Sequence, residues 1–436
     1  MIRRPGAILA LLTGLNLLNY LDRLVVSAVL PKVQEELGLS NFKGGLLATV
    51  FLLGYFLTSP IFGLLGDRFP RRGLIAAGVI VWSAATVASG FAVGAWSLLA
   101  ARAMVGVGEA SYATLAPTII DDVSPPDKKG RALAVFYIAT PIGAALGYLV
   151  GGFVESHWGW RSAFFVAGGP GILLALLCFL IKEPARKVST DKPDLLRDVK
   201  KLYAVPLYRQ GVLGFCAYTA AIGAFSYWAP KFLYKRYELD LGIANFRFGI
   251  ITVVAGAIAT VVGGRWADRK SRAIAVARTS EREKTYREQG DREPTEEEIA
   301  RREKEDNDAR VRGLLKICAT GSAIGAPIAL ACFLSPSPNA FFVLVFFAIV
   351  FLFLCTSPIN AVVLQAVPTE LRASAMALSI FAIHIFGDLW SPPFVGLLAD
   401  VLPIQIAMMT LPIALGASAV IWWPRKDQSQ SALGSS

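Results

Sequence analysis

Apolar residues run along most of this chain in long continuous stretches, broken only by short polar segments. The stretches do not alternate apolar and polar positions, so they favour helices over β-strands. A helix needs about 20 apolar residues to cross a bilayer core, because lipid offers its backbone no hydrogen-bond partners. Twelve stretches have about this length, and we expect each to be a membrane-spanning helix. They lie at residues 7–30, 44–65, 74–93, 96–120, 132–153, 162–181, 210–230, 246–264, 313–334, 339–362, 372–397 and 404–423.

A polar segment at 182–209 separates the first six stretches from the last six, and short motifs recur at matching places in the two halves. Asp67-Arg68 follows the second stretch, and Asp268-Arg269 follows the eighth. A repeat displaced by six helices is typical of transporters built from two parallel repeats. We therefore predict an all-α membrane protein with twelve transmembrane helices in two six-helix bundles. Its expected parts are an N-terminal bundle at 1–181, a cytoplasmic linker at 182–209, a C-terminal bundle at 210–423 and a cytoplasmic tail at 424–436.

The charge of the chain follows the expected membrane topology. The sequence is 55% hydrophobic and only 17% charged, with a formal net charge of +11. Its Lys and Arg residues gather in the loops on one side of the predicted membrane, and such loops are cytoplasmic. Both termini are then cytoplasmic, and the positive charge does not indicate a nucleic-acid partner. The five cysteines lie in or beside apolar stretches without metal-ligand spacing, so we expect packing residues and predict no metal site.

The segment 271–312, inserted between the eighth and ninth stretches, is dense in Glu, Arg and Lys. Glu297 precedes Arg301 by four residues, an order and spacing that support a helix. We expect a solvated cytoplasmic helix that is broken near Gly290 and Pro294. The sequence leaves open whether this insertion is a tether or a regulatory latch.

Few ionisable residues lie inside the predicted spans. Each is a functional candidate, because a charged side chain at the centre of a membrane helix costs about 2.5–3.5 kcal/mol. In the first span Asn16, Asn19 and Arg23 are three and four residues apart, so they share one helix face. We expect that face to line a polar cavity and, together with Tyr20, to bind substrate. Asp22 lies about 100° further round the helix.

The fourth span repeats this pattern, with Arg102, Gly106 and Glu109 four and three residues apart. Glu109 lies near the middle of the span. We predict that Arg23 pairs in turn with Asp22, with Glu109 and with an anionic substrate group. Arginine stays charged in proteins, so the two carboxylates are the groups expected to bind and release protons. The alternative is a static ion pair that only holds the first and fourth spans together.

Two further spans carry candidate functional groups. In the eleventh, His384 and Asp388 lie four residues apart on one face, and histidine exchanges protons near neutral pH. A proton-coupling pair and a packing pair that fixes a kinked helix are equal alternatives there. The seventh span ends in Tyr227-Trp228-Ala229-Pro230, which is either an outer gate or an interfacial anchor.

The Asp-Arg motifs at the cytoplasmic helix ends indicate a gate. Gly63 allows a neighbouring helix to approach, and Asp67 is placed to cap a helix N-terminus across the interface between the bundles. Arg68 and Arg71 are expected to bind carboxylates or lipid phosphates and so to hold the cytoplasmic side closed. The alternative is that these charges only set the topology. The residues predicted to gate are Gly63, Asp67, Arg68, Arg71, Arg102, Asp268 and Arg269.

Glycines recur every four residues in the fifth span, at Gly143, Gly147 and Gly151, with Gly152 beside the last. Small residues at this spacing allow close helix packing. We expect this ridge to be a seam along which the two bundles slide.

Two sets of motifs resemble known families. Residues 63–72 are similar to the signature between the second and third helices of the major facilitator superfamily, and residues 102–108 resemble its fourth-helix motif. A narrower set resembles the Spinster family of that superfamily. Its motifs are Asn19-Tyr20-Leu21-Asp22-Arg23, Gly106-Val107-Gly108-Glu109-Ala110-Ser111-Tyr112, Trp228-Ala229-Pro230 and Gly387-Asp388 with Ser391-Pro392.

The resemblance to the Spinster family implies a secondary active transporter with alternating access, in which Asp22, Arg23 and Glu109 form a central charged cluster. It implies a lipid-like or amphiphilic anionic substrate, moved with the help of a proton gradient and without a cofactor. A proton-coupled transporter of a sugar, a carboxylate or a drug is the alternative. The sequence shows no metal-ligand cluster or nucleophile elbow, so an enzyme is not expected. The chain looks like a bacterial inner-membrane protein that acts as a monomer, with membrane lipids and a small amphiphile as its partners.

Overall fold

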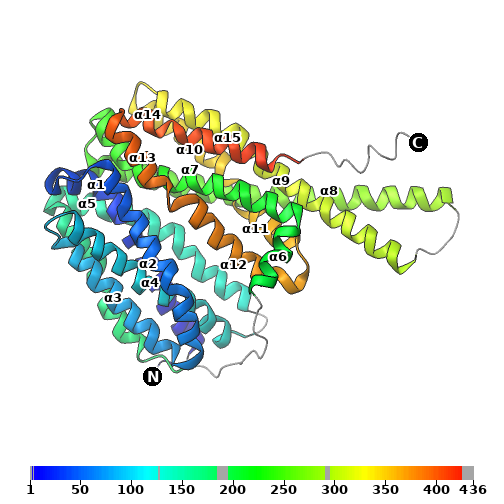
Figure 1. Cartoon of the computed structure of the whole chain (residues 1–436), viewed down its shortest axis with the longest axis horizontal. Helices are drawn as coiled ribbons and strands as arrows, with labels where there is room; N and C mark the ends of the chain where they lie inside the picture. The colour runs from blue at the N-terminus through cyan, green and yellow to red at the C-terminus, as the bar shows by residue number, and fades with distance from the viewer. Residues whose placement is uncertain (1, 3, 126–127, 184–194, 290–294, 425–436) are drawn as a thin grey trace.

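The computed structural model describes residues 2, 4–125, 128–183, 195–289 and 295–424, which form an all-α structure (Figure 1). The first bundle contains α1 (Pro5–Leu37), α2 (Asn41–Arg68), α3 (Arg71–Gly90), α4 (Ala95–Val123) and α5 (Lys129–Cys178), and is followed by α6 (Leu195–Ala204). The second contains α7 (Pro206–Tyr237), α8 (Leu241–Gln289), α9 (Glu296–Leu334), α10 (Pro338–Phe353), α11 (Thr356–Gln365), η1 (Thr369–Leu371), α12 (Arg372–Ile383), η2 (His384–Asp388), α13 (Ser391–Val401), α14 (Ile404–Met408) and α15 (Thr410–Trp422).

The predicted twelve membrane crossings are confirmed. In the described part of the chain, 10 helical segments are long and apolar enough to span a bilayer. One of them, α5, is two crossings, because its 50 residues are interrupted at Gly159, whose φ of 80° lies outside the helical region. The remaining crossing, the fourth along the chain, is α4. It is less apolar because it carries the buried Arg102 and Glu109. The last three crossings are each assembled from shorter helices, α10 with α11, α12 with α13 across η2, and α14 with α15.

The two bundles lie side by side, with α2 to α4 at the lower left of Figure 1 and the helices of the second bundle above and to the right of them. Between the bundles, α2 packs against α13 and α5 packs against α8. We call the end at which α1 passes into α2 the α1–α2 end, and the opposite end, where α6 lies, the linker end. Of the predicted linker and tail, residues 184–194 and 425–436 lie outside the described residues.

Close approach of α2 and α4 positions the ionisable residues of α4 at the centre of the first bundle. A Cβ on Gly106 would lie 2.0 Å from the carbonyl oxygen of Phe51 in α2, and one on Gly108 would lie 2.5 Å from the backbone nitrogen of Trp82 in α3. Helix backbones come this near only where the interface residue has no side chain. Glu109 is therefore held by backbone packing on two sides.

The glycine ridge of α5 does not form the expected seam between the bundles. A Cβ on Gly143 or Gly147 would lie 2.4 Å or 2.7 Å from carbonyl oxygens of α1, and Gly151 also faces α1. These three glycines pack helices of the same bundle together. Gly152 alone faces the other bundle, where it approaches the side chain of Asn245 in α8.

The charged insertion is a hairpin of two helical extensions that projects away from the bundles (Figure 1). The first extension is the end of α8, and the second is the start of α9, where Thr295 and Glu298 form a reciprocal capping box. Arg282 of α8 and Asp306 of α9 form an ion pair of 2.6 Å that joins the two. The expected break at Gly290 and Pro294 lies outside the described residues.

Replacement of Gly106 by alanine tests the packing of α4. Because the new methyl group meets the Phe51 carbonyl, we expect Gly106→Ala to lower the free energy of unfolding by about 1–3 kcal/mol, the usual cost of overpacking. Gly416→Ala is the matched control, since its Cβ has open space and alanine favours the helix. Thermal unfolding of both purified proteins is the measurement, and an undiminished melting temperature for Gly106→Ala would contradict the packing described.

Candidate functional site

A cavity of about 200 Å³ lies between the two bundles, near the middle of the molecule. The first bundle contributes residues of α1, α2 and α4 to its lining, and the second contributes residues of α7, η2 and α13. Its walls are Arg23, Leu24, Val26, Leu47, Ala48, Phe51, Leu52, Arg102, Gly223, Ser226, Tyr227, His384, Asp388 and Pro392. The cavity is thus charged on some walls and apolar on others.

Arg23 and Glu109 form the central ion pair. The Nε of Arg23 lies 2.8 Å from Oε2 of Glu109, and the Glu109 side chain is fully buried while that of Arg23 is 19% exposed. The other oxygen of Glu109, Oε1, is buried and has no hydrogen-bond partner among the described residues. Arg23 therefore reaches the cavity, and the buried Glu109 binds its guanidinium on the side away from the cavity.

Aromatic rings surround the Arg23 guanidinium. Its central carbon lies 4.9 Å from the ring centre of Tyr20, 5.0 Å from that of Phe51 and 5.3 Å from that of Tyr55. A cation over aromatic faces gains electrostatic attraction without a second counter-ion. Tyr20, expected to bind substrate, thus lies directly at the charged cluster.

Asp22 pairs with a different arginine. One of its oxygens accepts a hydrogen bond of 2.6 Å from Thr86 of α3, and the other lies 3.5 Å from Nη1 of Arg102. In this structure Arg23 contacts Glu109, and Asp22 lies on the far side of α1 against α3 and α4. Arg102, which we predicted to be a gating residue, belongs to this central cluster and lines the cavity.

The two asparagines of α1 lie outside the cavity lining. Asn16 donates hydrogen bonds of 2.9 Å to the Phe136 carbonyl oxygen and 3.3 Å to Thr140, both in α5. Asn19 is equally buried, and its Nδ2 has no hydrogen-bond partner in the described part of the chain. Asn16, Asn19 and Arg23 share one face of α1. The Asn16 end of this face packs against α5, and the Arg23 end lines the cavity.

His384 and Asp388 lie on the opposite wall of the cavity. The Nδ1 of His384 is 2.9 Å from an oxygen of Asp388, and both residues belong to the π-helical turn η2. Such turns insert an extra residue into a helix and often occur at functional sites. This pair therefore lines the cavity and also lies where the helix is irregular.

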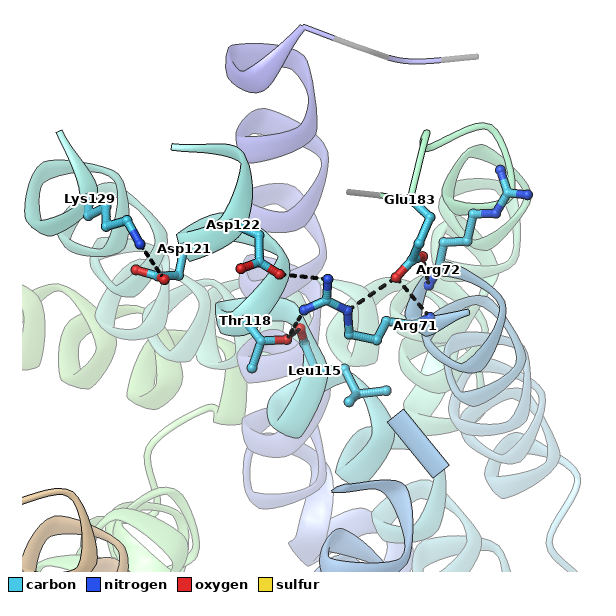
Figure 2. Close-up of polar contacts among 8 residues, drawn as sticks. All are labelled: Arg71, Arg72, Leu115, Thr118, Asp121, Asp122, Lys129 and Glu183. Atoms are coloured by element: carbon cyan, nitrogen blue, oxygen red, sulfur yellow. Dashed lines mark hydrogen bonds and ion pairs between the residues drawn. The ribbon is translucent and has the colours of Figure 1, made fainter. Parts of the chain in front are cut away.

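Arg71 holds the linker end of the first bundle together (Figure 2). Its guanidinium lies 2.7 Å from Asp122 at the end of α4 and 3.1 Å from Glu183, which follows α5. Glu183 also accepts the backbone N–H groups of Arg71 and Arg72, a favourable place for a carboxylate because these groups begin α3. All of these residues belong to one bundle, so the network fixes the bundle internally. Glu183 carries no motif and was missed from sequence.

The remaining predicted gating residues occupy other positions on α2 and α8. Gly63 has no close neighbour for a Cβ, the nearest atom being 4.0 Å away in Thr114, whereas a Cβ on Gly66 would meet Leu115 at 2.4 Å. At this end of α2, Gly66 rather than Gly63 therefore lets α4 approach. Asp67 and Arg68 are exposed at the end of α2. Asp268 and Arg269 are exposed within α8, which continues for twenty residues beyond them, so the second motif does not end a helix as the first does.

Hydrogen bonds across the bundles close the α1–α2 end of the molecule. Both carboxylate oxygens of Asp400, at the end of α13, accept backbone N–H groups at the start of α2, from Asn41 at 2.6 Å and Phe42 at 3.0 Å. Thr49 of α2 donates to the Leu389 carbonyl oxygen at 2.7 Å. The second bundle thus caps a helix of the first. We expected such a cap from Asp67 at the other end, and the structure places one here.

The end of α7 adds to this closure. The Tyr227 hydroxyl donates to the Gly44 carbonyl oxygen of α2 at 2.6 Å, and Ser27 of α1 donates to the Tyr227 carbonyl oxygen. The buried ammonium of Lys231 donates to the side-chain oxygens of Gln34 and Asn41. The sequence allows Tyr227 to be either an outer gate or an interfacial anchor, and its hydrogen bonds lie between the bundles.

The fold and the central cavity define a membrane transporter of the two-bundle type. A sequence model of the Major Facilitator Superfamily matches residues 12–280. The chain belongs to this superfamily, and within it to the Spinster family. It is 32% identical to "Probable sphingolipid transporter spinster homolog 2" of Arabidopsis thaliana, with 96% of this chain and 86% of the relative covered. It is 33% identical to "Protein spinster homolog 1" of Homo sapiens, with 91% and 73% covered. The relatives are transporters, and the chain is not an enzyme.

Solved structures agree with this assignment of the fold. A bacterial homologue of the human lysosomal transporter Spinster, in an inward-facing and occupied conformation, superposes with a TM-score of 0.78 at 21% identity and covers 97% of both chains. A D-xylose-proton symporter superposes with a TM-score of 0.72 at 17% identity, covering 98% of both. The two structures share the fold with this chain.

Removal of the Asp400 carboxylate tests the closure of the α1–α2 end. We expect Asp400→Ala to open this end, because the start of α2 loses its cap from the other bundle. The measurement is the labelling rate of an Ala48→Cys reporter in the cavity wall, with a membrane-impermeant maleimide added from that side. We expect the rate to rise about tenfold, the result of losing a cap contributing about 1–1.5 kcal/mol.

Asp240→Ala is the matched control for this experiment. Asp240 accepts the Ile243 N–H at 3.0 Å and so caps α8, but within its own bundle. We expect the reporter to react at the unmodified rate in this background. Equal rates in the Asp400 and Asp240 variants would show that the cap between bundles does not hold the end closed.

Proposed function

We propose that the chain is a secondary active transporter that moves a lipid-like or amphiphilic anion by proton-influenced alternating access. The observation that carries this proposal is the division of the cavity lining between an arginine cluster and apolar side chains. An amphiphile presents the same two surfaces. The names of the relatives, including a probable sphingolipid transporter, support the same class of substrate.

Arg23 is the residue proposed to bind the anionic head group. Its guanidinium is fixed by Glu109 and the aromatic rings, yet its side chain remains 19% exposed to the cavity. A guanidinium offers a planar fork of donors that matches a carboxylate or a phosphate. Arg102 reaches the same cavity from α4 and is a second cation for the head group.

The apolar part of the substrate would lie against apolar side chains of the first bundle and extend toward a pocket in the second. Leu24, Val26, Leu47 and Leu52 form apolar walls of the cavity. A small pocket inside the second bundle is lined by further apolar residues, and Ser226 belongs to the walls of both cavities. A tail that leaves the central cavity past Ser226 would enter apolar surroundings, which favours hydrocarbon over a hydrated sugar.

The proposed coupling depends on competition for Arg23. When Glu109 is ionised it holds the guanidinium, and when it is protonated that charge is available to the anion. Because Oε1 of Glu109 is unpaired, the carboxyl group has a site for the proton. Binding drives alternating access only if the substrate and the proton prefer different states of the transporter. His384 and Asp388 are the proposed second proton site, on the other bundle.

We propose that the linker end is cytoplasmic, because Lys and Arg are concentrated in its loops. Both chain ends then lie in the cytoplasm, and the chain would lie in a bacterial inner membrane. The cross-bundle hydrogen bonds lie at the α1–α2 end, so in this orientation they close the outer side. We further propose that the chain works as a monomer, with one cavity between its own two bundles.

Glu109→Gln tests the role of the buried carboxylate. Glutamine mimics the protonated acid, so we expect strong anion binding that is independent of pH. In the unmodified protein, affinity should fall as pH rises and Glu109 ionises, approaching tenfold per pH unit for one linked proton. Proteoliposome uptake between about pH 5 and pH 8 is the measurement. Glu305→Gln, on the exposed start of α9, is the control and should keep the pH dependence. Equal pH dependence in the Glu109 variant would exclude this role.

The substrate class is tested by thermal stability. A ligand that binds only the folded state raises the melting temperature, so a lysophospholipid should stabilise the purified protein and a sugar should not. Arg23→Gln should remove the stabilisation, because the head group loses its principal cation. Uptake into proteoliposomes under an imposed pH gradient, screened across lysolipids, sugars and drugs, completes the test. Stabilisation and uptake by sugars alone would favour the alternative class of substrate.

A further inference from the structure

A second and larger cavity lies at the linker end of the C-terminal bundle, away from the transport cavity. It is a groove of about 790 Å³ between the start of α7, the N-terminal extension of α9, the segment after α11 and the end of α15. One wall therefore belongs to the charged insertion. Its lining includes Arg209, Lys304, Asp308, Arg312, Leu213 and Ile421.

The polar lining of this groove is mainly cationic. Arg209 comes from α7, and Lys304 and Arg312 come from α9, against the one carboxylate of Asp308 in the described lining. Lys304, Asp308 and Arg312 follow one another at intervals of four, so they share one face of α9. The cations of two different helices thus converge on the same space.

Apart from Gln210, the other lining side chains are apolar, and the surrounding side chains mark a membrane surface. Leu213 and Ile421 line the groove beside the cations, and Leu213 is 55% exposed. Trp423 follows α15 and is 51% exposed, and Tyr203 precedes α7 and is 67% exposed. Exposed Trp and Tyr at the ends of membrane helices are typical of the boundary between lipid and water. The groove therefore has its cations at head-group level and its apolar side at the hydrocarbon.

Hydrogen bonds hold the walls of the groove in place. The Gln210 amide donates to the carbonyl oxygens of Ile421 at 2.8 Å and Trp423 at 3.0 Å, which joins α7 to α15. The Asn307 amide donates to the Gln365 carbonyl oxygen at 2.7 Å, which joins the α9 extension to the end of α11. The base of the insertion, around Asn307, is therefore fixed to the bundle, and Lys304 lies beside this contact.

We propose that this groove binds the phosphate head group of an anionic phospholipid, with Arg209 and Lys304 as its principal cations and Leu213 beside the acyl chain. Basic pockets between membrane helices bind such head groups, and each Lys or Arg strengthens the attraction to an anionic surface. The site is separate from the transport cavity. The insertion then has a binding function, since its helix α9 supplies one wall and a cation of a resident lipid site.

The test compares the full-length protein in nanodiscs of phosphatidylcholine alone and in nanodiscs with phosphatidylglycerol added in increasing amounts. We expect phosphatidylglycerol to raise the melting temperature in a saturable manner, since it binds only the folded state. The double variant Arg209→Gln with Lys304→Gln should weaken this binding about 30-fold. The double variant Arg278→Gln with Arg301→Gln removes the same charge from exposed positions of the hairpin that form pairs within their own helices. It should bind as the unmodified protein does.

Further arms distinguish the source of the phosphate and the site. Arg23→Gln should keep the response to phosphatidylglycerol, which separates this site from the transport cavity. Inorganic phosphate and glycerol 3-phosphate should give no comparable shift, and a shift from them alone would identify a site for soluble anions. Equal loss in both double variants would indicate surface charge only and overturn the proposal. If the groove variant unfolds in phosphatidylcholine, the exposed single variant Lys304→Gln should still weaken binding about fivefold.

Discussion

Two arginines and two carboxylates share the interior of the N-terminal bundle, and the arrangement of the rest depends on keeping them there. A single charge at membrane depth costs several kcal/mol, so each of the four needs a partner. Arg23 is paired with Glu109 and Arg102 with Asp22, and aromatic rings cover the guanidinium of Arg23. Glycine at position 106, where any side chain would meet the Phe51 carbonyl oxygen, helps α4 to come near enough to α2 for these contacts. The two buried ion pairs thus depend on the close packing of the helix backbones.

The two ends of the molecule are built differently. At the α1–α2 end, Asp400, Thr49 and Tyr227 form hydrogen bonds from one bundle to the other. At the linker end, the network of Arg71 and Glu183 joins elements of one bundle. In the alternating access proposed above, the hydrogen bonds between the bundles would break, whereas the bonds within one bundle would be kept. Each bundle can therefore move as a rigid body around the cavity, with the α1–α2 end closed in the state seen here.

Sequence was sufficient where the signal is local. Twelve apolar stretches, the motif around Glu109 and the pair His384 and Asp388 follow from hydrophobicity and helical spacing. The structure places His384 and Asp388 in the cavity wall, opposite the arginine that Glu109 binds. Sequence was insufficient where two distant segments must meet. Asp400 caps a helix that begins 359 residues before it, and Glu183 binds an arginine 112 residues away. The pairing of Asp22 with Arg102 also depends on the rotation of α4, which spacing alone does not determine.

The repeated Asp-Arg motif shows how one change of local structure alters the use of a repeat. In the first half α2 ends at Arg68, so the chain turns back and α3 begins at Arg71, where a carboxylate can bind its N-terminus. In the second half α8 continues past Arg269 into the insertion, so no helix begins there. The same six-helix plan therefore yields a compact internal network in one half. In the other half it yields a projecting hairpin, whose return helix α9 is docked on the bundle through Asn307 and carries its charges to the edge of the bundle.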